Sequence, residues 1–381
     1  MTLADASKRI KKEFEGALTS AGEQPATVDA ISTGVLSLDR ILGVGGMPTG
    51  RITEVYGPPS CGKTWLAMQL AAQVQKQGGT VGWVDAEHSF HLEWARRQGM
   101  DLSEETLGLT HPMFAEEALR QAQIFAEAGC QLVVLDSIGS LIPEKQAEDE
   151  LGSVHMAGIA RLLTTHLKVM RPLVYRTGTI YYLINQIRAN ISGYGDEPIT
   201  PGGWALQHNC SIRMKLHTTA AKSKIVMRSG EPAGQTVRAS IKKSNVDVPG
   251  RETELVIDFE QGYRVEEDLL DAAVEFGLIE RRGGWYYILD DQIQGAEKAI
   301  AFLVEHPGYA EQLIEAVLDA MKSRTTLEDA VGDQVDAEMD EMLAASPDPD
   351  ASDSDVSAPE AEVPDSLLPG VDNNTGDGAS Q

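Results

Sequence analysis

A phosphate-binding loop constrains this chain more than any other stretch of its sequence. Residues 57–64 fit the pattern G-x-x-x-x-G-K-[ST]. A β-branched run, Ile52–Tyr56, precedes the loop, and Leu66, Leu70 and Val74 follow it at helical spacing. A strand, a glycine loop and a helix in this order predict an α/β fold in which loop N–H groups and a helix N-terminus face phosphate. The loop residues are Gly57, Pro58, Pro59, Ser60, Cys61, Gly62, Lys63 and Thr64.

Two residues of this loop have distinct expected roles. Lys63 is expected to reach the β- and γ-phosphates of a nucleotide, and the Thr64 hydroxyl is expected to bind Mg²⁺. The alternative is a plain glycine turn between a strand and a helix. Eight matched positions with both flanks in place favour the nucleotide site.

Three further apolar runs predict buried strands at Thr80–Asp85, Gln131–Ser137 and Thr179–Gln186. Strands that alternate with helices imply a parallel sheet covered on both faces. Ligands of such sheets bind at the carboxyl ends of the strands. Asp85, Asp136 and Gln186 lie at those ends, so we expect them to converge on the loop.

These strand-end residues suggest parts of an ATP-hydrolysing site. Asp136 can hold Mg²⁺ together with Thr64, and a carboxylate must orient the attacking water. Glu87 is the candidate carboxylate, although an acid at a helix N-terminus is an equally good local explanation. Gln186 can sense the γ-phosphate or serve only as a capping amide.

The net charge of −26 is concentrated at the C-terminus. Residues 325–381 hold 16 Asp or Glu and no Lys or Arg, which leaves the remainder at a net charge of −10. This tail has too little apolar content to fold, so we expect it to be disordered and able to compete with DNA for basic surface. Three widely separated cysteines fit a reducing cytoplasm, and no apolar run is long enough to cross a membrane.

Several motifs in this chain resemble the bacterial RecA recombinase family. They are Ile31–Asp39, Gly43–Arg51, Asp85–His88, Ile184–Arg188, His155-Met156, Pro201–Gly203 and Leu278–Glu280, and they cover about residues 30–320 in the family's order. The resemblance implies a RecA-type P-loop ATPase core with a mainly parallel twisted sheet, a small α+β C-terminal domain and a disordered acidic tail. The expected divisions are an N-terminal arm (1–30), the core (31–262), a duplex-gathering domain (263–324) and the tail (325–381).

The resemblance also implies cofactors, partners and roles. The family binds ATP and Mg²⁺ between subunits of a helical filament on single-stranded DNA, and it exchanges strands with homologous double-stranded DNA. Glu87, Lys63 and Gln186 match its catalytic positions, and Thr64 and Asp136 match its metal positions. Trp94 stands at the base-stacking position, where the family has tyrosine, and His91 replaces an acid beside adenine. Lys243 matches one lysine that reaches the neighbour's ATP, whereas Asn245 replaces the second.

The family's DNA contacts map onto two loops and the C-terminal domain. Met156 and Ile191 match residues that insert between bases, although core filling is the ordinary explanation for Met156. Arg161, Lys168 and Arg188 match backbone contacts, and without the resemblance Arg188 is a solvated charge. The remaining positions assigned to DNA are Tyr194, Gly202, Gly203, Arg228, Arg238, Arg281, Arg282 and Lys298.

We therefore expect a cytoplasmic DNA-dependent ATPase and homologous recombinase that forms filaments and has no membrane partner. One alternative is a mediator or scaffold that binds DNA without productive turnover. Glu87 and Gln186 argue against it, while Asn245 leaves it open. The other alternative is a hexameric helicase of the same fold, which the aromatic run Trp285–Tyr287 in the C-terminal unit argues against.

Overall fold

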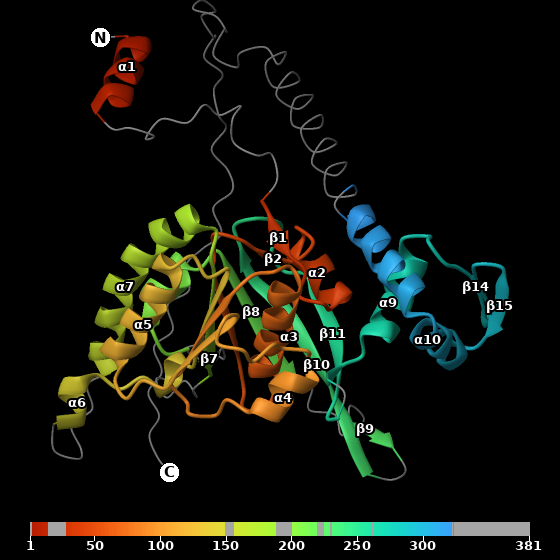
Figure 1. Ribbon diagram of the computed structural model, residues 1–381. Helices are drawn as coiled ribbons and strands as arrows, with labels where there is room; N and C mark the ends of the chain where they lie inside the picture. Colours follow the sequence, from red (N-terminus) through yellow and green to blue (C-terminus); the bar gives the residue numbers. More distant parts are fainter. Residues whose placement is uncertain are drawn as a thin grey trace, which may run out of the picture. The chain divides into compact units, whose positions relative to one another are not determined.

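The computed structural model describes residues 2–13, 28–148, 156–187, 200–218, 225–228, 231–260, 262–321 and 323. Within these residues, a ten-stranded sheet forms the centre of the larger unit (Figure 1). Its parallel part has the order β8-β3-β7-β6-β4-β5. These strands are β3 (Ile52–Gly57), β4 (Val81–Asp85), β5 (Leu107–Thr110), β6 (Leu132–Asp136), β7 (Ile180–Gln186) and β8 (Ile212–Thr218).

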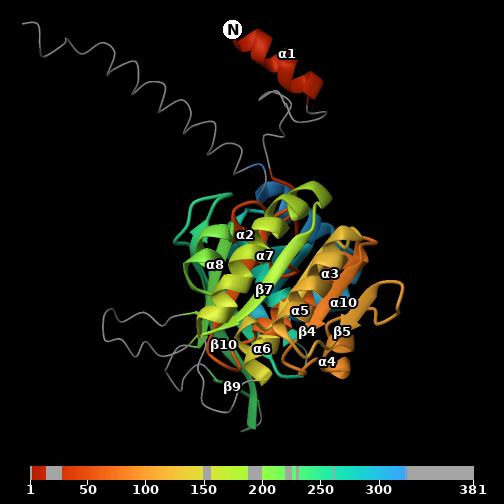
Figure 2. The same ribbon diagram turned by 90° about the vertical axis from the view of Figure 1, so that its left-hand side faces the viewer.

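Helices cover both faces of the parallel strands, as the continuous apolar runs predict. On one face α3 (Lys63–Lys76) packs into a core that includes Val134 of β6. On the other face α5 (Ala115–Glu127) and α7 (Met156–Thr177) pack over Val133 and Leu135; this is the side that Figure 2 turns toward the viewer. Neighbouring residues of one strand thus enter opposite cores, because side chains alternate across a sheet.

The sheet continues beyond β8 with antiparallel strands. These are β10 (Glu231–Ser244), β11 (Glu252–Asp258) and β12 (Gly262–Tyr263), and β9 (Ile225–Arg228) pairs with the far end of β10. The strand-like runs of the sequence at 211–217, 236–241 and 253–259 lie in β8, β10 and β11, and β10 extends well beyond its run. The pairing of β10 with β8 shifts register between Ile241 and Lys243.

A small α+β unit follows the sheet. It holds α9 (Val265–Glu275), β13 (Glu280–Arg282), β14 (Trp285–Ile288), β15 (Asp291–Gln294), α10 (Ala296–Glu305) and a helix over 307–321. Its own core includes Leu270, Ile288 and Leu303, and Leu36 of α2 (Leu36–Leu42) joins that core. The Ser37 N–H donates to Asp268, and Arg40 pairs with Glu275, so α2 ties this unit to the sheet.

At the N-terminus, α1 (Leu3–Glu13) is a helix, and residues 14–27 lie outside the described part of the chain. The acidic tail from 325 also lies outside it, so the expectation of disorder there remains a prediction. In the described residues, no helix is both long and apolar enough to span a bilayer.

Candidate nucleotide-binding site

The loop between β3 and α3 requires its glycines. A Cβ at Gly57 would lie 2.0 Å from the carbonyl oxygen of Leu216, and one at Gly62 would lie 2.5 Å from Ile257 Cδ1. Gly62 also has a φ of +85° at the N-cap of α3, a backbone conformation that disfavours other residues. The sequence therefore folds here into a tight loop that ends at a helix N-terminus, where backbone N–H groups can bind an anion.

Lys63, the first residue of α3, is buried and folds back over this loop. Its Nζ donates to the carbonyl oxygens of Pro58 at 2.7 Å and Gly57 at 3.2 Å. Cys61 Sγ lies 3.8 Å from the same nitrogen, and burial raises the pKa of this thiol, so the thiolate is disfavoured. The loop thus holds the ammonium group of Lys63 beside its backbone N–H groups.

Thr64, in the first turn of α3, meets Asp136 at the end of β6. The Thr64 hydroxyl donates to Asp136 Oδ2 at 2.8 Å. Burial raises the pKa of Asp136 to about 7; the Thr64 hydrogen bond opposes this shift, and Glu87 and Asp85 add to it. Asp136 Oδ1 is buried with no hydrogen-bond partner among the described residues. A hydroxyl and a partly orphaned carboxylate side by side fit an oxygen-binding cation such as Mg²⁺.

Glu87 and Gln186 face each other at the strand ends. Gln186 Nε2 donates to both carboxylate oxygens of Glu87 at 3.3 Å. The Glu87 N–H donates to the carbonyl oxygen of Asp136, which fixes Glu87 relative to β6. The neighbouring Asp85 is buried and accepts from the N–H groups of Ser89 and Phe90, so it holds the segment after β4 in place.

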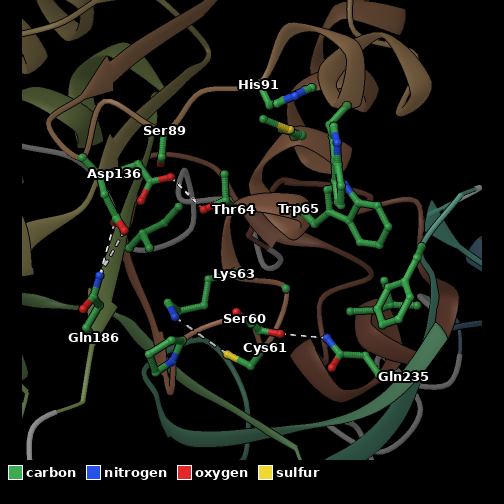
Figure 3. A pocket seen from close by; sticks show the side chains of 18 residues that line it. Ser60, Cys61, Lys63, Thr64, Trp65, Ser89, His91, Asp136, Gln186 and Gln235 are labelled. Carbon is green, nitrogen blue, oxygen red and sulfur yellow. Dashed lines mark hydrogen bonds between the residues drawn. The ribbon is translucent and has the colours of Figure 1, made fainter. Parts of the chain in front are cut away.

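A pocket of about 480 Å³ unites these groups (Figure 3). Lys63, Thr64, Asp136, Glu87 and Gln186 line it, together with residues 59–62 of the loop and Trp94 of α4 (Leu92–Arg97). Asp136 and Gln186 lie at one end of the view, and Trp65 and His91 lie at another. The structure thus brings together the residues that the sequence assigned to nucleotide and metal, apart from Gly57, Pro58 and Lys243, which do not line the pocket.

Several lining residues were missed by the sequence analysis. They are Trp65, Met68, Ser89, Ile184, Gln235, Ile257 and Phe259. Trp65 follows the loop motif directly, so its place in the first turn of α3 could have revealed it. Gln235 comes from β10 and donates to the carbonyl oxygen of Ser60 at 2.8 Å, a contact between segments far apart in the chain that no local motif signals.

A buried polar network lies beside the pocket on the same strands. Glu54 of β3 accepts from Arg213 Nε of β8 at 2.5 Å and from Asn185 Nδ2 of β7 at 2.8 Å. Asn185 also donates to the carbonyl oxygen of Pro201, and Arg213 donates to Thr200. The network therefore connects the strand of the loop, the strand of Gln186 and the segment that leads into α8 (Gly203–Asn209).

Lys243 of β10 contacts the C-terminal end of α8 in the same chain. Its Nζ donates to the carbonyl oxygens of Gln207 at 2.9 Å and His208 at 3.1 Å, and burial lowers its pKa. A lysine at this place satisfies carbonyls that end a helix. Asn245 lies two residues further on and is exposed.

The residues assigned to DNA are spread over the molecule. Arg161 and Lys168 are exposed on α7, seven residues apart and therefore on one face. Gly202 and Gly203 begin α8 with positive φ, and Arg238 pairs with Glu254 on the neighbouring strand at 3.0 Å. Arg281, Arg282 and Lys298 are exposed on the C-terminal unit. Arg188, Ile191 and Tyr194 lie outside the described residues, as do the side chains of Met156 and Arg228.

This fold and this pocket define a P-loop nucleotide-binding protein of the α/β class. The family model of the RecA N-terminal domain matches residues 1–264, and that of the RecA C-terminal domain matches residues 267–322. The chain belongs to the RecA family, whose members are ATPases, and it is a RecA-type protein of DNA recombination and repair.

Two RecA proteins agree with this membership. Protein RecA of a Nitratiruptor species is 38% identical over 323 residues, which cover 83% of this chain and 92% of that protein. Protein RecA of Thermus aquaticus is 37% identical, with coverage of 84% and 94%. Among solved structures, the crystal structure of the RadB recombinase matches 61% of this chain and 98% of its own, with a TM-score of 0.47 and 24% identity.

Proposed function

We propose that this chain is a DNA-dependent ATPase that assembles on single-stranded DNA as an ATP-loaded filament and exchanges strands with homologous duplex. The observation that carries the proposal is the convergence of Lys63, Thr64, Asp136, Glu87 and Gln186 on one pocket. These are the groups that positioning and charge neutralisation of a phosphoryl transfer require.

The loop end of the pocket binds the triphosphate in this proposal. Lys63 exchanges its loop carbonyl partners for phosphate oxygens, and the N–H groups at the start of α3 bind the remaining negative charge. Thr64 and Asp136 would hold Mg²⁺, whose charge would offset the negative charge of the triphosphate. Deprotonation of Asp136 accompanies this binding, because a cation lowers the pKa that burial has raised.

Glu87 orients and deprotonates the attacking water, and Gln186 reports on the γ-phosphate. Gln186 Nε2 donates to both carboxylate oxygens of Glu87, so we expect a γ-phosphate to compete with Glu87 for this amide. That exchange links the nucleotide to β7, whose next residues lead into the segment assigned to DNA. Through this exchange of Gln186 contacts, the filament binds DNA while ATP is bound and releases it after hydrolysis.

Steady-state phosphate release by the purified chain tests this proposal. We expect ATP hydrolysis to rise at least tenfold when circular single-stranded DNA is added, and the Lys63→Ala variant to lack hydrolysis under both conditions. Lys76→Ala, at the far end of the same helix, serves as the matched control and should behave like the parent. Hydrolysis that is independent of DNA, or that persists in Lys63→Ala, would contradict the proposal.

A further inference from the structure

The end of the pocket away from the phosphate-binding loop is built from two tryptophans. Trp65 of α3 and Trp94 of α4 have ring centroids 4.8 Å apart at an angle of 45°. Trp65 is buried, whereas Trp94 is 36% exposed. The buried Trp65 ring therefore packs against the Trp94 ring and limits its movement. Trp94 thus offers a fixed aromatic surface on which a flat ring can stack.

The carboxylates of the pocket lie at its other end. Among the described lining residues only Glu87 and Asp136 are acidic; Asp136 accepts from Thr64, and Glu87 accepts from Gln186. Ser60 belongs to the loop and Ser89 lies beside Asp136 (Figure 3), so the polar side chains closest to the aromatic end are Gln235 and His91. Gln235 donates one amide N–H to Ser60, and its other N–H and its oxygen remain for a ligand.

His91 is the adaptable polar group at the aromatic end. It precedes α4, it is exposed, and its ring meets Trp94 edge-on at 6.0 Å and 70°. Its ring nitrogens have no hydrogen-bond partner in the part of the chain that the structure describes. In neutral imidazole one nitrogen donates and the other accepts, and the two tautomers exchange these roles.

The exchangeable donor and acceptor roles of His91 suit both adenine and guanine. Adenine presents an amino group where guanine presents a carbonyl oxygen, so a carboxylate at this place would accept from adenine and repel guanine. His91 can accept from the amino group in one tautomer and donate to the carbonyl oxygen in the other. Stacking on Trp94 does not discriminate between adenine and guanine, because every base has a π-face.

We infer that the site binds ATP and GTP with comparable affinity and that His91 is the residue that permits it. The inference rests on the proposed nucleotide site and adds the class of substrate that this site accepts. Pockets that lack a dedicated hydrogen-bonding partner for the distinguishing group separate ligands by roughly 10–200-fold at most. We expect the two dissociation constants to lie within about tenfold of each other, at the low end of that range.

Tryptophan fluorescence of the full chain gives a direct test, because Trp65 and Trp94 line the pocket. The parent, His91→Asp and His91→Asn are titrated with ATPγS and GTPγS in the presence of Mg²⁺. Asp and Asn both favour the position before a helix, so neither variant should disturb α4. Asn keeps a donor and an acceptor, whereas Asp only accepts.

The parent and His91→Asn should bind both analogues within about tenfold, and His91→Asp should weaken GTPγS by at least tenfold relative to ATPγS, as the loss of a matched hydrogen bond implies. Binding of ATPγS with GTPγS more than 100-fold weaker in the parent would overturn this inference alone. Identical selectivity of the Asp and Asn variants would overturn the role of His91. Failure of both analogues to bind the parent would overturn the proposed nucleotide site itself.

Discussion

Single residues decide turnover in this account, and Glu87 is the clearest case. Its carboxylate faces the pocket and is held by Gln186. Glu87→Gln should lower the rate of ATP hydrolysis by at least 100-fold, because an amide cannot act as a base for water and general bases contribute about 10²–10⁴-fold. The dissociation constant for ATPγS should change little, since the loop and Thr64 are untouched.

The matched control for this variant is Glu93→Gln, which makes the same change on the exposed face of α4. Rapid-quench hydrolysis and equilibrium binding should be measured on both proteins and the parent. A Glu87→Gln variant that turns over near the parent rate would remove Glu87 from the catalytic role.

Asp39 should make the stability of the fold depend on pH. It is fully buried and accepts from Ser32 and Thr33, yet burial dominates and raises its pKa from 3.8 to about 7. The folded state thus favours the protonated acid. Protonated Asp39 therefore adds to the free energy of unfolding. This contribution is complete below about pH 4 and is lost as the pH rises to about 7.

Urea unfolding at pH 5, 6 and 7 checks this expectation. The free energy of unfolding of the parent should fall more steeply with pH than that of Asp39→Asn, by up to about 1.4 kcal/mol per pH unit. Burial also raises the pKa of Asp136 and Asp268, and the charge of Asp268 raises the pKa of Asp39, so part of the difference between the two proteins comes from this interaction. Parallel pH dependences would show that Asp39 is ionised in the folded chain.

At the scale of elements, the Glu54–Arg213 pair joins β3 to β8 inside the protein. Arg213→Leu leaves the buried Glu54 carboxylate without its cation, which should cost about 3–5 kcal/mol of unfolding free energy. The double variant Glu54→Leu/Arg213→Leu should recover much of that loss, because no uncompensated charge remains. Urea unfolding of the three proteins measures both steps, and a double variant no more stable than Arg213→Leu would refute this reading.

The elements themselves were largely predictable. β4 and β6 are short runs of consecutive apolar residues bounded by polar ones, and such runs form strands that are buried on both faces. The strand ends also predicted that Asp136 and Gln186 meet at the loop, because parallel strands end at the same edge of a sheet. Asp85, which was expected there too, is buried and instead holds the segment after β4. The rest of the site was not predictable, since Gln235 and the Glu54–Arg213 pair depend on contacts between distant segments.

At the scale of the whole molecule, charge is the dominant feature. The 16 acids of residues 325–381 have no basic residue among them. We propose that this tail, as a tethered polyanion, competes with DNA for basic surface such as Arg281, Arg282 and Lys298. Deletion of this tail should speed binding of double-stranded DNA severalfold at low salt, and the gain should shrink at higher salt, where the Debye length falls below about 10 Å.

Stopped-flow measurement of duplex binding by full-length and truncated protein, at low and high salt, tests the role of the tail. A truncated protein in which Lys298 is also changed to Ala serves as the control, because it should lose part of the gain. Equal rates for the full-length and truncated proteins at low salt would reduce the tail to an aid to solubility.

The proposed function requires that the chain form ATP-loaded filaments on single-stranded DNA. Electron microscopy of the full chain with circular single-stranded DNA, Mg²⁺ and ATPγS tests it most directly. We expect continuous helical filaments that coat the DNA and that are absent without nucleotide. Closed rings, or scattered DNA-bound particles that do not depend on nucleotide, would contradict it.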